Sequence, residues 1–507
     1  MQLKTFFLNK EDKIFIQNNK SSKIEEKKNK ILIQISVDYF FLLLLKTLKL
    51  SKYKNYEIHG IWTTAILTCK KKIIFENFQN KIKNIIYNFL LKKKFYKLFS
   101  SIGVKNIFDI NNEEKIDVAK LKKISKNIFK NLKNKKDVLR IRYKKILIGD
   151  LIYDSYIRYR VVPTVNINDK FLYDIILKSL KAIEFCEINL NNKGYKLYHT
   201  AYTSYINNGL VARYFLYNQK KVYSSGDRFS TIKKLSITNF SHMKNFSKFN
   251  QDFSKLKNKK EKIVQARKEF QKKINGKLDI SSVYMGNKSY KKNKILIPKK
   301  LDNVDGVLFL HDIYDAVHDH SGLIFNDFYE WTIFSLNIIR DFNLNIAIKP
   351  HPNSINEGNE TYIKLKNQYN NLFWLNPSIS NKKILSKKNI HFVVSMVGSV
   401  IYEIIYFNKL GICAGNSPSS SFKSTLTAKN LNEYKKYLIN SKYLSSKIKV
   451  NKLDLYKTYY VNFLYDLFEK QKEFLDLGLY KLLDRGNNSK LNYFDKKINE
   501  KYLPKNL

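Results

Sequence analysis

The sequence predicts an α/β protein with two doubly wound lobes, followed by helices toward its C-terminal end. Three observations carry this prediction: buried strand-like runs alternate with helical runs up to about residue 227, a polar stretch interrupts them, and the alternation resumes after residue 300. Strands that alternate with helices build mostly parallel sheets covered by those helices. A chain of 507 residues is long enough for two or more domains, each with its own core.

The first lobe is expected to span residues 1–227, where apolar runs of strand length recur between longer helical patterns. The expected strands are 31–36, 57–64, 139–150, 196–202 and 220–226. The expected helices are 37–50, lysine-rich helices within 76–135, 168–188 and 207–219.

The second lobe is expected to span residues 301–425, after a helical connection over 228–300 and before a C-terminal helical segment over 426–507. Its expected strands are 306–312, 344–350, 372–377, 390–396 and 410–415. Its expected helices are 326–342, 360–369, 380–388 and 399–408.

The formal net charge of +50 raises the question of a nucleic-acid partner. The lysines are spread along the whole chain, and the abundance of lysine, asparagine and isoleucine is what an A/T-biased coding sequence produces on any fold. No zinc finger, RNP-like aromatic motif or basic heptad region accompanies them. We therefore expect no specific nucleic-acid partner, but a surface that attracts anionic membrane lipids or anionic substrates.

The cysteines and the apolar runs bear on the compartment. Cys69, Cys186 and Cys413 are far apart in the sequence, which favours a reducing compartment over a disulfide framework. The N-terminus lacks the apolar core of a signal peptide. The most apolar run, 39–45, is far shorter than the roughly 20 residues that cross a bilayer. We expect a cytoplasmic protein, peripheral on the inner face of the plasma membrane.

The stretch "IKPHPN" places His351 between two prolines and directly after Lys349, in a chain with only 7 prolines. Prolines force an extended exit from the strand 344–350. Ligands of doubly wound sheets bind outside the carboxyl ends of the strands. Lys349 and His351 are therefore expected to be held out toward a ligand; the alternative is a proline-rich turn with a surface histidine.

The stretch "SMVGSVIYE" follows the next buried strand. Gly398 allows a tight turn, Ser399 can cap the helix that follows, and Glu403 lies one turn into that helix. The free backbone N–H groups of such a helix start favour an anion. Together with the lysine and histidine of the previous motif, they suit the phosphate of a nucleotide. The alternative is an ordinary strand–helix junction.

The stretch "FLHDIYDAVHDHSG" collects acidic residues and histidines after a strand. Its spacing matches no established zinc motif, so we expect no metal site. His311, Asp312 and His318 are candidates for acid–base or substrate-orienting roles, and a polar loop is the alternative.

The first lobe offers four acceptor-side candidates near strand ends and on the next helix, each of which can also be structural. They are His199, Tyr202, Arg213 and Asp150.

At these residues the sequence resembles the capsule polysaccharide biosynthesis family, glycosyltransferases of the GT-B fold related to capsular Kdo transferases. The resemblance covers roughly residues 140 to 420 and is carried by "YHTAYTSYINNGLVARYFLYNQKKVY", "LFLHDIYDAVH", "NDFYEW", "IKPHPN" and "VVSMVGSVIYEIIYFNKLGICAGNSP". The lysine–histidine–proline stretch and the serine-rich helix start are also similar to bacterial sialyltransferases and CDP-glycerol glycerophosphotransferases.

The resemblance implies two Rossmann-like lobes facing a cleft, with the donor nucleotide bound by the C-terminal lobe and no required metal or cofactor. It implies that Lys349 and His351 contact the donor phosphate. Gly398 and Ser399 complete that site, and Glu403 binds hydroxyls of the nucleotide or sugar. The chain departs from the family pattern at Ile401 of "GSVIYE", where the family has a glycine, and in "NKLGIC", which lacks the proline of the family. Neither departure touches the implied phosphate contacts.

We therefore expect a glycosyltransferase that moves a sugar from a nucleotide-sugar donor to a growing surface or capsular polysaccharide or its lipid-linked acceptor. Two alternatives stay open. One is a CDP-polyol phosphotransferase, and the other is a non-catalytic basic protein that binds nucleic acid or membrane.

Overall fold

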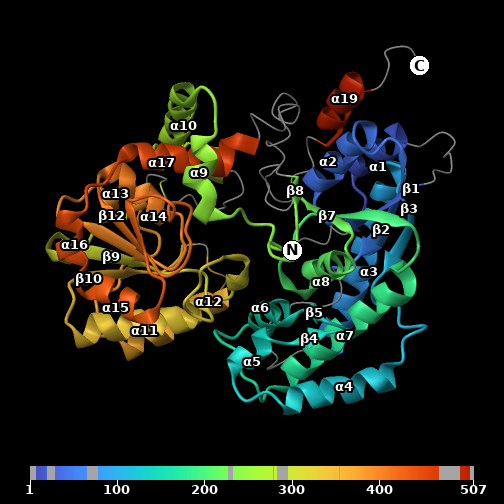
Figure 1. The fold of residues 1–507 in the computed structure, drawn as a ribbon, viewed down its shortest axis with the longest axis horizontal. Helices are drawn as coiled ribbons and strands as arrows, with labels where there is room; N and C mark the ends of the chain where they lie inside the picture. The colour runs from blue at the N-terminus through green and yellow to red at the C-terminus, as the bar shows by residue number, and fades with distance from the viewer. Residues whose placement is uncertain are drawn as a thin grey trace. The chain divides into compact units, whose positions relative to one another are not determined.

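The computed structural model divides the chain into two compact units (Figure 1). Unit 1 comprises residues 1–161, 165–242 and 471–507, and unit 2 comprises 162–164 and 243–470. The structure describes residues 7–19, 29–64, 78–225, 232–277, 279–282, 290, 295–352, 354, 356–466 and 491–502.

Unit 1 is built on a six-stranded sheet in the order β3-β2-β1-β6-β7-β8. All neighbouring pairs are parallel except β7 with β8. The order reverses between β1 and β6, which makes the sheet doubly wound. The strands are β1 (Asn29–Ile35), β2 (Tyr56–Trp62), β3 (Lys105–Asp109), β6 (Tyr195–Thr200), β7 (Lys221–Ser224) and β8 (Lys233–Lys234).

The helices of unit 1 pack against this sheet and against one another. They are α1 (Lys10–Asn18), α2 (Tyr39–Leu50), α3 (Phe78–Ser101), α4 (Val118–Lys130), α5 (Lys135–Leu139), α6 (Gly149–Arg160), α7 (Lys170–Leu190), α8 (Tyr205–Tyr217) and α19 (Leu491–Tyr502).

Helix α2 contains the most apolar run of the sequence. Asp38 starts it by accepting a hydrogen bond from the Phe40 N–H at 2.9 Å. Residues Phe40–Leu45 are all buried, so the run forms a core helix, as predicted. Within the described residues, no helix combines the length and the apolar content that a membrane crossing requires.

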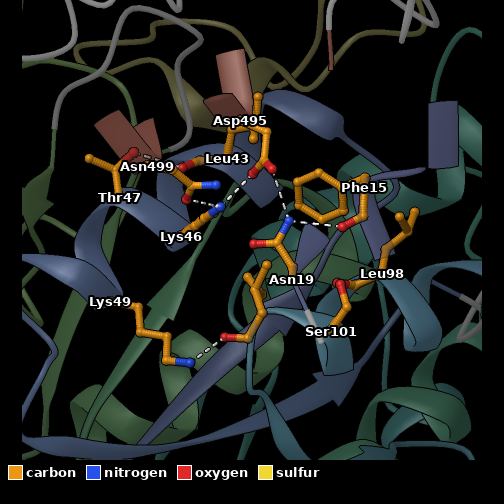
Figure 2. A network of polar contacts seen from close by, with 11 residues as sticks. Phe15, Asn19, Leu43, Lys46, Thr47, Lys49, Leu98, Ser101, Asp495 and Asn499 are labelled. Carbon is orange, nitrogen blue, oxygen red and sulfur yellow. Dashed lines mark hydrogen bonds and ion pairs between the residues drawn. The ribbon is translucent and has the colours of Figure 1, made fainter. Parts of the chain in front are cut away.

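A buried ion pair joins α19 to α2, although the two helices lie at opposite ends of the sequence (Figure 2). The ammonium of Lys46 lies 2.5 Å from Asp495 Oδ1 and donates to Asn499 Oδ1 at 2.6 Å. Asn19 donates to the other Asp495 oxygen at 3.0 Å. Both charged side chains are almost fully buried, so each depends on its partner.

Unit 2 contains a five-stranded, fully parallel sheet in the order β10-β9-β11-β12-β13. Its strands are β9 (Gly306–Phe309), β10 (Ile346–Lys349), β11 (Phe392–Ser395), β12 (Leu410–Cys413) and β13 (Thr425–Thr427). Its helices are α9 (Phe249–Ser254), α10 (Lys259–Ile274), α11 (Phe328–Asp341), α12 (Asn356–Gln368), α13 (Asn381–Leu385), α14 (Val400–Glu403), α15 (Leu431–Ile439), α16 (Ser441–Lys447) and α17 (Lys452–Tyr459). The strands β9 to β12 are short and wholly buried, so their ends, rather than their faces, are available to ligands.

The predicted fold class is confirmed: both units are doubly wound α/β structures. Some elements differ from the prediction. The lysine-rich range 76–135 also contains β3, and β13 was not predicted. Residues 372–377 form no strand, only an isolated bridge between Ile348 and Trp374. The predicted helix 399–408 is a single α turn, α14, continued by a 3-10 turn over Ile404–Phe407.

The predicted strand 139–150 is instead a small antiparallel hairpin, β4 (Arg142–Tyr143) and β5 (Ile146–Leu147), after which α6 begins at Gly149. At Gly149 the first turn of α6 packs directly on the preceding chain, which leaves no room for a side chain. A Cβ there would lie 2.1 Å from the Val138 carbonyl oxygen.

The two units divide the chain differently from the predicted segments. Most of the range 228–300 belongs to unit 2, where α10 packs against α17. The range 426–507 is shared, because α17 belongs to unit 2 and α19 to unit 1. Parts of both predicted segments, 228–231 and 467–490 among them, lie outside the described residues.

Replacing Lys46 or Asp495 alone with alanine should destabilise unit 1 by about 3–5 kcal/mol, because an uncompensated buried charge remains. The double replacement Lys46→Met/Asp495→Leu should cost clearly less than either single change. Thermal melts of the full chain measure this, with the exposed pair Lys496 and Glu500 of the same helix as the control. Equal melting temperatures for wild type and the single variants would contradict the prediction that the Lys46–Asp495 pair stabilises unit 1.

Candidate functional site

The strand order of unit 2 reverses between β9 and β11, since β10 lies on one side of β9 and β11, β12 and β13 lie on the other. Loops that leave neighbouring strands in opposite directions at such a reversal open a crevice at the carboxyl edge of the sheet. The three motifs of the second lobe follow β9, β10 and β11. The topology therefore brings their starting points to one edge of one sheet.

His311 joins the ends of β9 and β11. Its Nε2 lies 3.0 Å from Ser395 Oγ, and the Val397 backbone N–H donates to the same nitrogen at 3.3 Å. The ring stacks on Phe328, with centroids 4.4 Å apart and planes 11° from parallel. Because Nε2 accepts the Val397 N–H, its lone pair faces the turn after β11.

Burial of the His311 ring, with smaller contributions from the charges of His351 and His320, holds its pKa well below the usual range. The imidazole is therefore neutral at pH 7. A neutral ring whose Nε2 lone pair is occupied holds the turn in place, and it has little capacity to act as a base through that nitrogen.

Gly398 occupies the centre of this turn. A Cβ at this position would lie 2.8 Å from Ser395 Oγ and 3.4 Å from His311 Cε1. The close approach of the turn to the imidazole therefore depends on the missing side chain, which supports the predicted tight turn.

Ser399 precedes α14, but its side chain makes no helix-capping hydrogen bond. Only its backbone carbonyl takes part in the first turn of the helix, by accepting hydrogen bonds from the backbone N–H groups of Tyr402 and Glu403. α14 has only four residues, so its helix dipole is small and adds little to the binding of an anion at this position. Ser399 as a residue is partly exposed.

Lys349 is not held out from the strand end. It is 1% exposed, and its ammonium donates to the Pro377 carbonyl at 2.9 Å. Burial lowers its pKa to about 8. The reason is strand geometry: residue 349 shares a face with Ala347, and that face packs into the core with Phe309 and Leu375.

His351, the next candidate along the chain, is partly exposed. Burial of its ring lowers its pKa to about 4, and the charge of Lys349 acts in the same direction while Asp315 opposes it. At pH 7 the imidazole is neutral, so it offers one N–H donor and one acceptor rather than a fixed positive charge.

Glu403 is buried, with 2% exposure, and both of its carboxylate oxygens have partners. Lys273 of α10 lies 2.6 Å from one oxygen, and the Tyr290 hydroxyl donates to the other at 2.8 Å. The carboxylate is thus committed to the segment that precedes β9 along the chain. Contact with a ligand hydroxyl would need a rearrangement of this pair.

Asp312 and His318 lie in the segment that follows β9, where both are partly exposed. Asp312 accepts from the Tyr314 backbone N–H at 3.4 Å, and His318 sits in a 3-10 turn over Val317–Asp319. Among the described residues, no group of three or more His, Cys, Asp or Glu side chains is arranged to hold a metal ion.

Two of the four acceptor-side candidates in unit 1 form a largely buried ion pair. Arg213 of α8 contacts Asp150 of α6 at 2.5 Å, donates to the Leu147 carbonyl at 2.9 Å and stacks on Phe240. This pair ties α6 to α8. Its geometry is that of a structural contact.

The other two candidates lie at and just after the end of β6. His199 is fully buried, both ring nitrogens have hydroxyl partners, in Tyr53 at 2.8 Å and Ser225 at 2.6 Å, and burial lowers its pKa to about 3. The Tyr202 ring lies against His242, with ring centroids 4.2 Å apart and planes tilted by 42°. The structure does not bring His199 together with the Arg213–Asp150 pair through any described contact.

Gln34 was missed in the sequence and marks the order reversal of unit 1. This buried residue of β1 accepts from Thr200 Oγ1 at 2.8 Å and donates to Thr63 Oγ1 at 3.0 Å and Asn208 Oδ1 at 2.7 Å. It joins the ends of β1, β2 and β6, whereas His311 joins the ends of two strands in unit 2. The signal was a single polar residue inside the apolar run "ILIQIS".

No family model matches the chain, and no curated protein is detectably similar to it. Among solved structures, it is similar to UDP-N-acetylglucosamine 2-epimerases. The Listeria monocytogenes structure is 9% identical, covers 88% of this chain and 98% of its own, and has a TM-score of 0.24. The Methanocaldococcus jannaschii complex with UDP-GlcNAc and UDP is 11% identical over 85% and 98%, with a TM-score of 0.27. The S. aureus MnaA–UDP structure is 11% identical over 94% and 97%, with a TM-score of 0.23. Likenesses this low carry no argument about function.

Replacing Lys349 with methionine should stabilise unit 2 at pH 7 by about 2–3 kcal/mol, because the folded state then buries no charge. The folded-state pKa of about 8 lies below the unfolded value, so wild type recovers this stability as pH rises from 8 through 10. The gain of the variant should shrink over that window. Melting temperatures of both proteins at pH 7 and pH 10 measure this gain, and Lys364→Met, which replaces an exposed lysine, is the control. A Lys349→Met variant that is less stable than wild type at pH 7 would show that burial of the Lys349 charge is not unfavourable.

Proposed function

We propose that this chain is a nucleotide-sugar-dependent glycosyltransferase whose donor site lies at the carboxyl ends of β9, β10 and β11. It moves the sugar to a surface or capsular polysaccharide or to its lipid-linked acceptor, on the cytoplasmic side of the membrane. One observation carries the proposal: His311 ties the ends of β9 and β11 together where the strand order reverses. Doubly wound sheets bind their ligands at that reversal.

The donor phosphate binds beside His351 and the Gly398–Ser399 turn. His351 donates one N–H, and the approaching anion raises the pKa of the imidazole, so that the hydrogen bond becomes charge-assisted. The Ser399 hydroxyl, which makes no cap bond, donates a second hydrogen bond. Gly398 lets the backbone of the turn come close to the phosphate oxygens.

Lys349 supports this site from within the sheet. Its ammonium stays bonded to the Pro377 carbonyl, and its charge acts on the phosphate through the low-dielectric core rather than by contact. Its charge already lowers the pKa of His351. A destabilising buried lysine is the kind of feature that function, rather than stability, maintains.

Transfer proceeds by attack of an acceptor hydroxyl oxygen on the anomeric carbon of the donor sugar. The bond from that carbon to the phosphate oxygen breaks, and its electron pair leaves with the nucleotide. Asp312 takes the proton of the acceptor hydroxyl, because it is partly exposed whereas the Nε2 lone pair of His311 is occupied. The hydrogen bonds to the phosphate stabilise the charge that develops on it.

A thermal-shift panel of CMP, CDP, UDP, GDP and ADP should reveal one nucleotide that raises the melting temperature of wild type, since binding to the folded state alone stabilises it. The shift should disappear in His351→Ala. The matched control is His391→Ala, because His391 is exposed and precedes β11, at the opposite edge of the same sheet.

Loss of the shift in both His351→Ala and His391→Ala, or no shift with any nucleotide, would show that the donor site does not lie at the "IKPHPN" stretch. Stabilisation by CDP-glycerol together with CDP, but by no nucleotide sugar, would replace the proposal with a CDP-polyol phosphotransferase. A non-catalytic basic protein would bind polyanions equally well with and without His351.

Asp312→Asn should lower the transfer rate by about 10²–10⁴-fold, because the amide cannot take a proton. Nucleotide binding should be unchanged, since the proposed phosphate contacts come from other residues. Sugar release from the donor that the panel selects, measured beside the thermal shift, separates the two effects. Unchanged turnover in Asp312→Asn would assign the base elsewhere, with His318→Gln as the next variant.

A further inference from the structure

Helix α4 of unit 1 carries a concentrated positive charge that the candidate site does not use. It contains five lysines and no acidic residue, and all five lysines are exposed. We call them the α4 lysine face: Lys120, Lys122, Lys123, Lys126 and Lys130. Helical spacing puts four of them on one side of the helix, with Lys120 at its edge.

The opposite side of α4 is fixed to the body of unit 1. On that side Leu121 and Ser125 are buried. The Phe129 ring lies on the flank of the helix next to Lys126 and packs edge-on against Tyr173 of α7, at 6.0 Å between centroids. α4 packs along α7, and Figure 1 shows it at the edge of unit 1. The lysine face is therefore presented in one fixed direction.

This charge is not neutralised locally. None of the five lysines forms an ion pair with any described residue. Three acids lie just before the helix: Asp117 caps it by accepting from the Lys120 N–H at 2.9 Å, Glu113 pairs with Lys181 at 2.8 Å, and Glu114 is exposed. The face extends over about 15 Å, from the rise of a helix over ten residues.

We propose that the α4 lysine face adsorbs the protein to an anionic membrane surface. A membrane of acidic lipids is a flat field of diffuse negative charge, which flexible ammonium groups match without a fixed geometry. The face lacks the arginine forks and exposed aromatic rings that read or stack on nucleic acids. α4 also exposes no large apolar side chain, so the adsorption is electrostatic, without insertion.

The proposal is independent of the proposed transferase activity, because α4 and the candidate site belong to different units. It also separates a local feature from the overall charge of +50, which a biased composition can produce without any function. The test must therefore compare two variants that lose the same number of lysine charges, one from α4 and the other from a different helix.

The experiment is co-sedimentation of the full chain with vesicles of phosphatidylcholine, with and without phosphatidylglycerol. The test variant is Lys122→Gln/Lys126→Gln/Lys130→Gln. The control variant, Lys259→Gln/Lys260→Gln/Lys268→Gln, removes three exposed charges from α10. Only the vesicles that contain phosphatidylglycerol should bind wild type and the control, and added salt should weaken the binding. The α4 variant should bind about tenfold or more weakly, with an unchanged melting temperature.

Equal weakening by both variants would mean that the whole surface, and not α4, binds the membrane. No preference of wild type for the anionic vesicles would overturn the proposal outright. A duplex-DNA binding assay of the same three proteins provides the remaining arm: loss of DNA binding in the α4 variant, with vesicle binding intact, would assign the face to nucleic acid.

Discussion

The hydrogen bonds of one imidazole hold the carboxyl edge of the second unit together. His311 lies just after β9 and accepts the Val397 N–H from the turn after β11. It therefore joins the two parallel strands between which the strand order of the sheet reverses. Its ring is fixed by Phe328 and kept neutral by burial. This contact helps to hold the Gly398–Ser399 turn, which forms one side of the candidate phosphate site. A protonated ring would meet the Val397 N–H with a second donor and could not hold the turn.

The sequence located this edge but not the direction of its side chains. The prolines around His351 and the glycine at 398 correctly marked the strand end and the tight turn, because both residue types restrict the backbone in known ways. Lys349 is expected from the sequence to reach outward, yet the alternation along β10 turns it into the core, where its ammonium meets the Pro377 carbonyl and the Phe309 ring. Whether a polar residue at a strand end points toward ligand or core depends on what covers each face, and that is decided by segments distant in the sequence.

The alternation of strands and helices was sufficient to predict two doubly wound units, because both faces of a parallel sheet must be covered. The errors fell where local pattern and tertiary packing disagree. Residues 139–150 look like a strand, but they form a two-residue-by-two-residue hairpin, and α6 begins at Gly149, where the close approach of Val138 leaves no room for a side chain. For His199 the sequence leaves a site role and a structural role open, and the structure shows a buried histidine whose two nitrogens both have hydroxyl partners. Only distant partners, Tyr53 among them, reveal that role.

The docking of α19 on α2 has a consequence for how the protein is made. Lys46 is separated from its carboxylate partner Asp495 by 449 residues, and the chain builds the entire second unit between them. Domains usually fold in the order in which they leave the ribosome. Here the second unit is complete while the first still lacks its final helix, and Lys46 must wait for the last part of the chain before its charge is matched. The first unit to begin folding is thus the last to finish.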